Sequence, residues 1–380
     1  MSLQGKKILS IYYKHKPGGL CKRLYMMFNA LAEGGGEVHY IAVEPYPISH
    51  AKVIPHLLWT PFHRTEGVFF WIYFIATAPF YALWIGYRFK VDIVSVFGAV
   101  YGFLALLLKG LFGKPILTFV RSDPYEVNRL LQRPPFLLLL EDLLARIGLK
   151  YSDRIITVND RLREIISSRY RIGPEKISVL TNHIQSRPER FLPIDLCRKE
   201  LGLNSEDFVV ITASVLDQRK NVEILIRSGA FLTAPAVFLI VGDGPEKRRL
   251  QQLAEEANGK ARFVFFGWQG DLSPFFGAAD LFVTTSQHEG CSNSLLEALA
   301  WDLPCLASDL PEIREVLPSE RLLFRPNDAA ALAEKISRAV LDQASLEQMR
   351  KACAEAREKL RFDWDKAVIH LHEAAFHRAA

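Results

Sequence analysis

Short apolar runs alternate with amphipathic stretches along almost the whole chain. In the first half the runs cover residues 8–13, 38–43, 93–97, 116–120, 155–158 and 177–180. In the second half they cover residues 209–213, 237–241, 263–266, 281–284 and 305–307. Strands that are apolar at successive positions are buried on both faces, which is typical of parallel sheets covered by helices. The pattern therefore predicts an α/β protein with two doubly wound parallel sheets.

A segment with two prolines separates the two sets of runs. The segment SRPERFLPID contains Pro188 and Pro193, which lack a backbone donor and bias the residues before them away from helix. A chain of 380 residues also exceeds the size at which one hydrophobic core keeps growing. We therefore expect a first domain over residues 1–187 and a second over residues 188–362.

One apolar segment interrupts the rhythm. Residues 67–87, GVFFWIYFIATAPFYALWIGY, carry no charge and are long enough to cross a bilayer as a helix. A crossing is disfavoured, because Pro79 lies inside the segment and the strands before and after it must share one sheet. Three alternatives remain open: a buried helix, a helix in an oligomer interface, and a helix or hairpin that dips into the membrane interface. The many aromatic side chains favour the membrane interface.

Charge is distributed unevenly between the two halves. Residues 1–190 contain 25 Lys and Arg against 14 Asp and Glu, whereas residues 191–380 contain 22 against 28. A basic first half favours an anionic partner, such as a phosphate-bearing acceptor or an anionic membrane surface, with an evenly solvated surface as the alternative. Nucleic acid is not expected, because the basic residues are scattered and accompany no binding motif.

The cysteines and the first residues bear on the compartment. The five cysteines are widely spaced, without the pairing or clustering with His that would indicate disulfides or zinc. The first ten residues lack the apolar core of a secretory signal. We therefore expect a cytoplasmic protein.

Residues 286–317, SQHEGCSNSLLEALAWDLPCLASDLPEIREVL, carry the strongest chemical signal. They follow an apolar run, so we expect a strand, a loop and a helix that begins near Ser292 to Ser294. The free amides at such a helix start can bind an anionic diphosphate without a metal. Glu289 and Glu297 are suited to accept hydrogen bonds from sugar and ribose hydroxyls. As an alternative, Ser294 and Glu297 can form a capping box, in which Glu297 bonds only to its own helix start.

This segment resembles the E-x7-E signature of the retaining GT-B glycosyltransferases of family 4 (glycosyl transferases group 1). The resemblance rests on Glu289, Gly290, Asn293, Glu297 and Ala298, followed by Pro304 and by Pro311 to Ile313. Further matches, in the family's order, are residues 17–20, 157–184, 220–222, 241–245, 265–267 and 279–283. The resemblance spans nearly the entire chain and implies a GT-B fold, in which two Rossmann-like domains face a central cleft. It also implies that a C-terminal helix, residues 363–380, packs back on the first domain.

The resemblance implies roles for the matching residues. Glu289 would bind the sugar hydroxyls and Glu297 the donor ribose. Lys220, with Arg219 beside it, would neutralise the charge on the leaving phosphate; a solvated lysine at a helix start is the alternative. The other residues expected to bind the donor are Gly290, Cys291, Ser292, Asn293 and Ser294 around the diphosphate, Gly18 and Gly19 in a first-domain loop that comes close to it or only forms a turn, Gly242, and Trp268 and Gln269 near the base.

Several positions depart from the family pattern. Val215 stands where the family has a phosphate-binding arginine, which Arg219 can replace only in part. After the fourth apolar run, Arg121 and Asp123 stand near the place of a histidine close to the sugar, so either is a candidate for that catalytic role. Asp302 stands where a glycine often ends the helix, a left-handed position that aspartate tolerates at some cost.

The resemblance implies a retaining reaction, in which the acceptor hydroxyl attacks on the face that the nucleoside diphosphate leaves. No metal and no cofactor besides the sugar donor are expected, and a UDP-sugar is favoured over a GDP-sugar. The residues Asp363-Trp364-Asp365 match a metal-binding D-x-D pattern, but we interpret Asp363 as the cap of the last helix.

The apolar, basic first half favours a lipid-linked or cell-envelope glycan as acceptor, and a peripheral position on the inner face of the cell membrane. Three other functions remain as alternatives. They are a degenerate non-catalytic scaffold that binds nucleotide sugars, a GT-B epimerase or phosphorylase, and a glycosidase that uses Glu289 and Glu297 as its two carboxylates.

Overall fold

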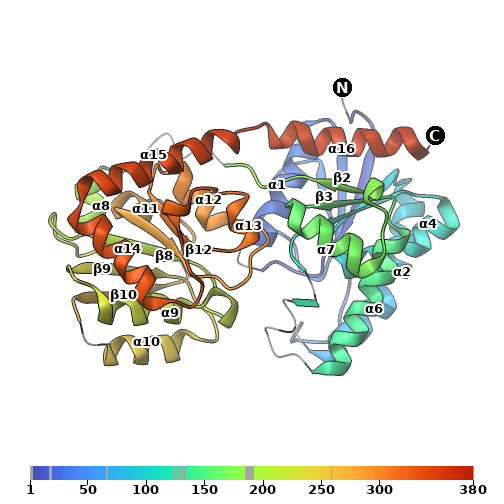
Figure 1. Ribbon diagram of the computed structural model, residues 1–380. Coiled ribbons are helices and arrows are strands. Elements are labelled where there is room, and N and C mark those ends of the chain that lie inside the picture. Colours follow the sequence, from blue (N-terminus) through green and yellow to red (C-terminus); the bar gives the residue numbers. More distant parts are fainter. Residues whose placement is uncertain are drawn as a thin grey trace. The chain divides into compact units, whose positions relative to one another are not determined.

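The computed structural model describes residues 3–16, 19–65, 67–123, 125–126, 129, 134–184, 192–257 and 259–379. The chain divides into two units. The N-terminal unit comprises Met1–Thr181 and Asp363–Ala380, and the C-terminal unit comprises Asn182–Phe362 (Figure 1). The boundary expected between residues 187 and 188 lies outside the described residues.

The N-terminal unit is built on a parallel sheet of seven strands, in the order β3-β2-β1-β4-β5-β6-β7. The strands are β1 (Lys7–Ile11), β2 (Glu37–Ala42), β3 (Val53–Leu57), β4 (Ile93–Phe97), β5 (Ile116–Val120), β6 (Arg154–Thr157) and β7 (Ile177–Val179). Each predicted run of this half overlaps one strand. The strands β4 and β5 are buried at every position, as expected of a sheet covered on both faces.

The edge strand β3 was not predicted. It contains Pro55, and only Val53 among its residues is buried, whereas the other four are half-buried or exposed. Proline is tolerated at a sheet edge, where its missing N–H breaks no ladder hydrogen bond. A strand of this kind lacks the continuous apolar run by which the other six were recognised.

Seven helices are described in the N-terminal unit. They are α1 (Gly19–Glu33), α2 (Val68–Phe89), α3 (Ala99–Leu104), α4 (Leu106–Phe112), α6 (Pro135–Tyr151), α7 (Asp160–Tyr170) and α16 (Trp364–Ala379). The apolar segment forms α2, which is the one helix among the described residues that is long and apolar enough to span a membrane. One face of α2 is buried in the core of the unit, through Phe70, Phe74 and Ala82 among others. This contact makes α2 a covering helix of the sheet.

The last helix, α16, is tied to the core of the N-terminal unit. Asp363 accepts the backbone N–H of Lys366 at 2.9 Å, which confirms its interpretation as a helix cap. Trp364 and Val368 are buried in the core. The fully buried His372 ring donates from Nδ1 to the Val368 carbonyl at 2.8 Å, and its Nε2 lies 3.0 Å from the Ser95 hydroxyl on β4.

His372 should make the stability of this unit depend on pH. Burial lowers the pKa of His372 to about 4, from 6.5 in an exposed histidine. The folded state therefore holds the neutral ring while the unfolded state takes up a proton, so the stabilisation is present above pH 6.5 and is lost as the pH falls towards 4. Between pH 7 and pH 4 the unfolding free energy of the wild type should fall by about 3 kcal/mol more than that of His372→Leu.

Urea unfolding at the two pH values measures this difference. The exposed His370 on the same helix provides the control. The unfolding free energy of His370→Leu should fall between pH 7 and pH 4 by as much as that of the wild type. If the unfolding free energy of His372→Leu falls with pH as much as that of the wild type, another group causes the pH dependence.

The C-terminal unit contains a parallel sheet of six strands, in the order β10-β9-β8-β11-β12-β13. The strands are β8 (Val209–Ala213), β9 (Ala236–Val241), β10 (Ala261–Gly267), β11 (Leu281–Thr284), β12 (Cys305–Ser308) and β13 (Leu323–Phe324). Its helices are α8 (Ile194–Glu200), α9 (Val222–Ser228), α10 (Lys247–Glu256), α11 (Ser273–Ala278), α12 (Asn293–Ala300), α13 (Pro311–Arg314), α14 (Ala329–Leu341) and α15 (Gln343–Lys359). The five predicted runs of this half form β8 to β12.

Asp302 ends α12 in the left-handed conformation that was expected, with φ of 60°. Its carboxylate forms an ion pair with Arg357 on α15. This partner helps to explain why an aspartate is accepted at a position that usually favours glycine.

Candidate functional site

The strand order of the C-terminal sheet indicates where a ligand would bind. The chain leaves β8 towards β9 and β10 on one side, whereas β11 leads to β12 and β13 on the other. The order therefore reverses between the neighbouring strands β8 and β11. Ligands of open parallel sheets bind outside the carboxyl ends of the strands at such a switch point. The two loops that begin there, residues 214–221 and 285–292, carry Lys220 and Glu289.

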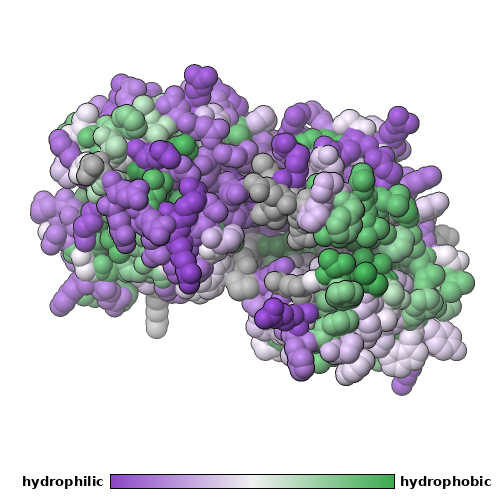
Figure 2. All heavy atoms as spheres, turned by 90° about the horizontal axis from the view of Figure 1, so that it is seen from below, coloured by the Kyte–Doolittle hydropathy of each residue, from purple (hydrophilic) through white to green (hydrophobic). Residues whose placement is uncertain are grey.

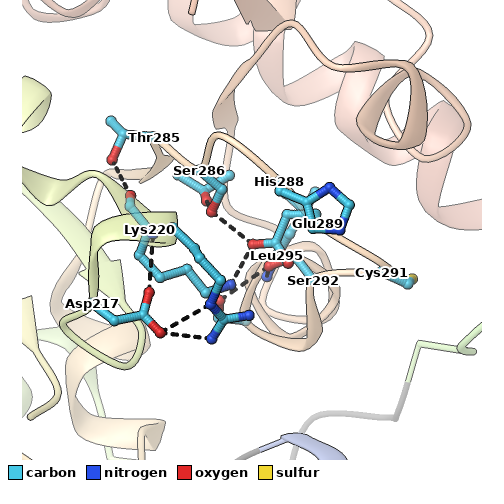
Figure 3. A network of polar contacts seen from close by, with 12 residues as sticks. Asp217, Lys220, Thr285, Ser286, His288, Glu289, Cys291, Ser292 and Leu295 are labelled. Carbon is cyan, nitrogen blue, oxygen red and sulfur yellow. Dashed lines mark hydrogen bonds and ion pairs between the residues drawn. The ribbon is translucent and has the colours of Figure 1, made fainter. Parts of the chain in front are cut away.

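Lys220 and Glu289 form an ion pair at this switch point (Figure 3). Ser286 donates its hydroxyl to the same carboxylate oxygen of Glu289 at 2.7 Å. Burial by itself would raise the pKa of Glu289, but the charge and hydrogen bond of Lys220, the Ser286 hydrogen bond and the charge of Arg219 outweigh it and hold the pKa below its ordinary value. The pair therefore presents a charged ammonium and an ionised carboxylate at the end of the sheet.

Backbone contacts fix the position of Lys220. Its backbone N–H donates to the Asp217 carbonyl at 3.1 Å, which closes a short 3-10 turn over Gln218–Lys220, and to the Asp217 carboxylate at 3.3 Å, which caps that turn. Asn221 then takes a left-handed conformation, with φ of 48°, and α9 begins. From the β11 loop, Thr285 donates its hydroxyl to the Lys220 carbonyl at 2.9 Å. These contacts tie the two loops together and aim the lysine side chain at Glu289.

Arg219 is already engaged within its own loop. Its Nε and Nη2 donate to Asp217 at 3.1 and 2.6 Å. Arg219 was expected to replace in part the family's phosphate-binding arginine, whose place Val215 takes. Its guanidinium, however, shares its charge with the buried carboxylate of Asp217. Arg219 and Lys220 are thus each paired with a buried carboxylate, and Lys220 differs in that its partner, Glu289, lies across the switch point in the loop after β11.

The start of α12 follows the Glu289 loop. Ser292 caps this helix, and its hydroxyl accepts the Leu295 N–H at 3.4 Å. The helix starts at Asn293, inside the expected range. The capping-box alternative is wrong, because Ser294 lies inside the helix and the cap belongs to Ser292. Glu297 lies in the second turn and is half-buried.

Asn182 stabilises the loop before α12. Its side-chain amide donates to the Cys291 carbonyl at 3.3 Å and to the Asn293 side chain at 3.1 Å. Gly290 and Cys291 lie between the ion pair and the start of α12, which Ser292 to Ser294 form. This segment is where free helix amides can meet an anion.

Three residues that support the Lys220–Glu289 pair were given no role from the sequence. Glu312 on α13 accepts the backbone N–H of Glu289 at 3.1 Å, and its carboxylate lies 3.6 Å from Nδ1 of His288. Ser286 and Thr285 make the contacts described above. Glu312 was part of the matching motif, but its contact with Glu289 depends on how α13 folds back onto the loop, which no local pattern indicates.

The remaining donor residues of the C-terminal unit follow β9 and β10. Gly242 donates its N–H to the Gly267 carbonyl at 2.7 Å and has φ of 143°, where side chains are disfavoured. Trp268 is exposed, and Gln269 donates its side-chain amide to the Phe266 carbonyl at 2.8 Å. These residues lie at the carboxyl end of the same sheet, on the β9 side of the switch point.

The first-domain candidates belong to the N-terminal unit. Gly18 lies outside the described residues, and Gly19 begins α1. Arg121 and Asp123 directly follow β5. Asp123 is buried, accepts the Tyr125 N–H at 3.1 Å and lies 3.6 Å from Arg169. These contacts give Asp123 a part in ordering its own loop.

Two family models match the chain in sequence order. The model for glycosyltransferase family 4 matches residues 17–186, and the model for glycosyl transferases group 1 matches residues 194–359. In Escherichia coli, UDP-Gal:alpha-D-GlcNAc-diphosphoundecaprenol alpha-1,3-galactosyltransferase is 28% identical over 277 residues, which cover 70% of this chain and 70% of that protein.

Solved structures share the fold over nearly the whole chain. Sucrose-phosphate synthase from Thermosynechococcus elongatus superimposes with a TM-score of 0.82 at 21% identity, covering 98% of both chains. Anabaena HepE, solved in complex with UDP-glucose, gives a TM-score of 0.74 at 17% identity, covering 97% of this chain and 99% of the other. Taken with the two family matches, these structures show that the fold is GT-B and that the chain belongs to the group 1 glycosyltransferases of family 4 type.

Proposed function

We propose that the protein is a retaining glycosyltransferase that moves a sugar from a nucleoside-diphosphate sugar, with a UDP-sugar favoured, to a hydroxyl of a lipid-linked or cell-envelope glycan. The observation that carries the proposal is the Lys220–Glu289 pair beside a capped helix start at the switch point of the C-terminal sheet. It combines a cation, free amides and an acceptor carboxylate, which match the diphosphate and the hydroxyls of such a donor.

In the proposed reaction the bond between the sugar carbon and the diphosphate oxygen breaks, and a bond from the acceptor oxygen to that carbon forms on the same face. The acceptor proton goes to the leaving phosphate. Lys220 and the amides around Cys291 to Ser294 stabilise the negative charge on the diphosphate. Glu289 holds the sugar hydroxyls and Glu297 the ribose. In this proposal Lys220 and the backbone amides compensate the charge of the leaving diphosphate, and no metal is invoked.

Two relatives support the choice of substrates. The name of the Escherichia coli relative gives a UDP-sugar as donor and a diphosphoundecaprenol-linked sugar as acceptor. The Anabaena structure holds UDP-glucose. A lipid-linked acceptor would also suit the basic, apolar N-terminal unit.

Donor binding should raise the melting temperature of the wild type and leave that of Glu297→Ala nearly unchanged. A nucleotide that binds only the folded state stabilises it by about 2.7 kcal/mol at one hundred times its Kd. The measurement is a thermal shift with UDP-, GDP- and ADP-sugars, together with release of the nucleoside diphosphate. Glu334→Ala, at an exposed glutamate of α14, is the matched control and should respond like the wild type.

The outcomes separate the candidate functions. Stabilisation with release of nucleoside diphosphate supports transfer. Strong stabilisation without release would point to a non-catalytic scaffold, which the missing arginine at Val215 and the engaged Arg219 would help to explain. If the nucleotide raises the melting temperature of Glu297→Ala as much as that of the wild type, Glu297 does not bind the donor.

A further inference from the structure

The outer face of α2 is apolar and exposed along its whole length. Phe69, Ile72, Phe80, Trp84 and Tyr87 recur at helical spacing and point away from the buried face, and the side chains of Phe69 and Tyr87 are 77% and 73% exposed. A helix on the surface of a soluble monomer normally carries polar residues there. The exposed face of α2 therefore suits an apolar surrounding.

The apolar surface continues beyond α2. The Tyr87 ring stacks on Phe112 at the end of α4, with 6.1 Å between ring centroids, and Leu111 beside it is exposed. On α6, four exposed apolar residues lie on one helical face: Phe136, Leu139, Leu140 and Leu143. Figure 2 shows hydrophobic side chains gathered over a broad area of the N-terminal unit. We call the exposed apolar residues of α2, α4 and α6 the apolar face.

Basic residues follow both apolar helical stripes. On α6 the exposed face continues from Leu143 into Arg146 and Lys150. At the end of α2, Arg88 and Lys90 are exposed next to Tyr87. Aromatic and aliphatic side chains next to Lys and Arg match the boundary between lipid tails and anionic headgroups, where rings sit at the interface and long basic side chains reach the phosphates.

Acidic residues are few around this surface. From residue 67 to residue 122 the sequence contains one carboxylate, Asp92, which accepts the Lys7 backbone N–H at 2.9 Å. On α6, Glu141 and Asp142 match Arg146 and Lys150 in number, and Asp142 lies 3.4 Å from Arg146. The net positive charge therefore comes from the part around α2 and α4, where Arg88, Lys90, Lys109 and Lys114 stand against Asp92. An apolar surface with this charge favours an anionic bilayer over a second copy of the same basic face.

We propose that the apolar face and the basic residues Arg88, Lys90, Arg146 and Lys150 form a docking surface for an anionic lipid bilayer. Rings and leucines enter the interface, and the basic side chains contact headgroup phosphates. This surface lies on the N-terminal unit, whereas the donor residues Lys220, Glu289 and Glu297 lie on the C-terminal unit. Membrane docking and donor binding can therefore be tested separately.

The experiment is co-sedimentation of the full chain with vesicles of phosphatidylcholine alone or with added phosphatidylglycerol. The wild type should bind the anionic vesicles, and added salt should weaken the binding. Phe69→Ser/Trp84→Ser and Arg88→Gln/Lys90→Asn should each bind at least about tenfold more weakly. Phe231→Ser/Leu341→Ser, at exposed apolar residues of the C-terminal unit, is the matched control and should bind like the wild type.

Size-exclusion chromatography and the nucleotide thermal shift complete the test. Both groups of variants should keep the wild-type response to nucleotide, so a failed donor assay with intact vesicle binding would count against the proposed function alone. No binding of the wild type to anionic vesicles, or equal binding by all variants, would overturn the docking proposal. A wild-type dimer that Phe69→Ser/Trp84→Ser converts to a monomer would overturn it too, because the face would then be covered by a second copy.

Discussion

Lys220→Met should lower the rate of nucleoside diphosphate release by about 10²–10³-fold, the usual cost of losing one group that stabilises charge in the transition state. The ammonium joins the loop that follows β8 to the loop that follows β11, and methionine keeps the unbranched stem of the side chain up to the missing ammonium. The measurement is single-turnover release from the donor that stabilises the wild type. Lys366→Met, at an exposed lysine of α16, is the control and should leave the rate unchanged.

The same substitution should also destabilise the C-terminal unit. Glu289 is buried, and Lys220 is the main group that opposes the effect of burial on its pKa. Without the lysine that pKa rises, and an uncompensated buried carboxylate costs about 3–5 kcal/mol at neutral pH. The direction in which this stability difference changes with pH follows from the lowered pKa of Glu289 in the wild type. The stability contributed by the pair is present above the ordinary glutamate pKa of 4.5 and is lost as the pH falls below it, so the two proteins should converge in acid.

A double variant separates the two effects. Lys220→Met/Glu289→Gln removes the buried charge together with its partner, so it should regain most of the lost stability while remaining inactive. Urea unfolding at neutral pH and the release assay are run on the same samples. If the double variant recovers activity as well as stability, the lysine acts only by holding the fold, and its proposed role at the phosphate is wrong.

The sequence pattern predicted the strands according to how deeply they are buried. Runs such as residues 116–120, which form β5, are apolar at every position but Thr118, because both faces of the strand are covered. The strand β3 was not predicted, because only Val53 of this edge strand is buried and Pro55 and His56 interrupt its apolar run. The start of α12 was predicted to within two residues, but its cap was not, whereas Asp363 was correctly predicted as the cap of α16. Ser292 and Ser294 offer the same hydroxyl, and only the backbone of the loop decides between them.

The functional site was predicted as a set of residues but not as a set of contacts. Lys220 and Glu289 lie 69 positions apart in sequence and meet because β8 and β11 are neighbours at the switch point. The resemblance to the family singled out both residues, whereas the supporting contact from Glu312 depends on the path of the chain between α12 and α13. The ion pair between Arg219 and Asp217 likewise depends on the geometry of the side chains and was not predicted from the sequence.

Gly242→Ala should destabilise the C-terminal unit by roughly 3–5 kcal/mol, through backbone strain together with overpacking. A methyl group at this position would lie 1.8 Å from the carbonyl oxygen of Ser214. The backbone also has φ of 143°, which side chains rarely adopt. Neither neighbour can move easily, because Ser214 donates its N–H to the Val241 carbonyl at 3.0 Å and Gly242 is held by Gly267.

Two other glycines of the same unit separate strain from crowding. Gly202 has φ of 66° but open space around it, so Gly202→Ala should cost about 1–2 kcal/mol from strain alone. Gly270 has open space and no positive φ, so Gly270→Ala should change stability by less than about 0.5 kcal/mol. Urea unfolding measures the change in unfolding free energy of the three variants. The change is read from the midpoint of the transition, provided that the dependence on urea concentration is the same as in the wild type. A cost for Gly242→Ala no larger than that for Gly202→Ala would mean that the chain is not tightly packed at Ser214.

The substitution at Gly242 should also weaken donor binding in the protein that remains folded. Ser214 begins the loop that leads to Lys220, and Leu216 in that loop donates its N–H to the Asp243 carbonyl at 2.9 Å. A displaced Ser214 would therefore shift the segment that positions the lysine. The thermal shift with the stabilising nucleotide, measured where Gly242→Ala is still folded, should be smaller than in Gly202→Ala. An equal shift in the two variants would show that Gly242 serves the packing of β8 and β9 and not the donor site.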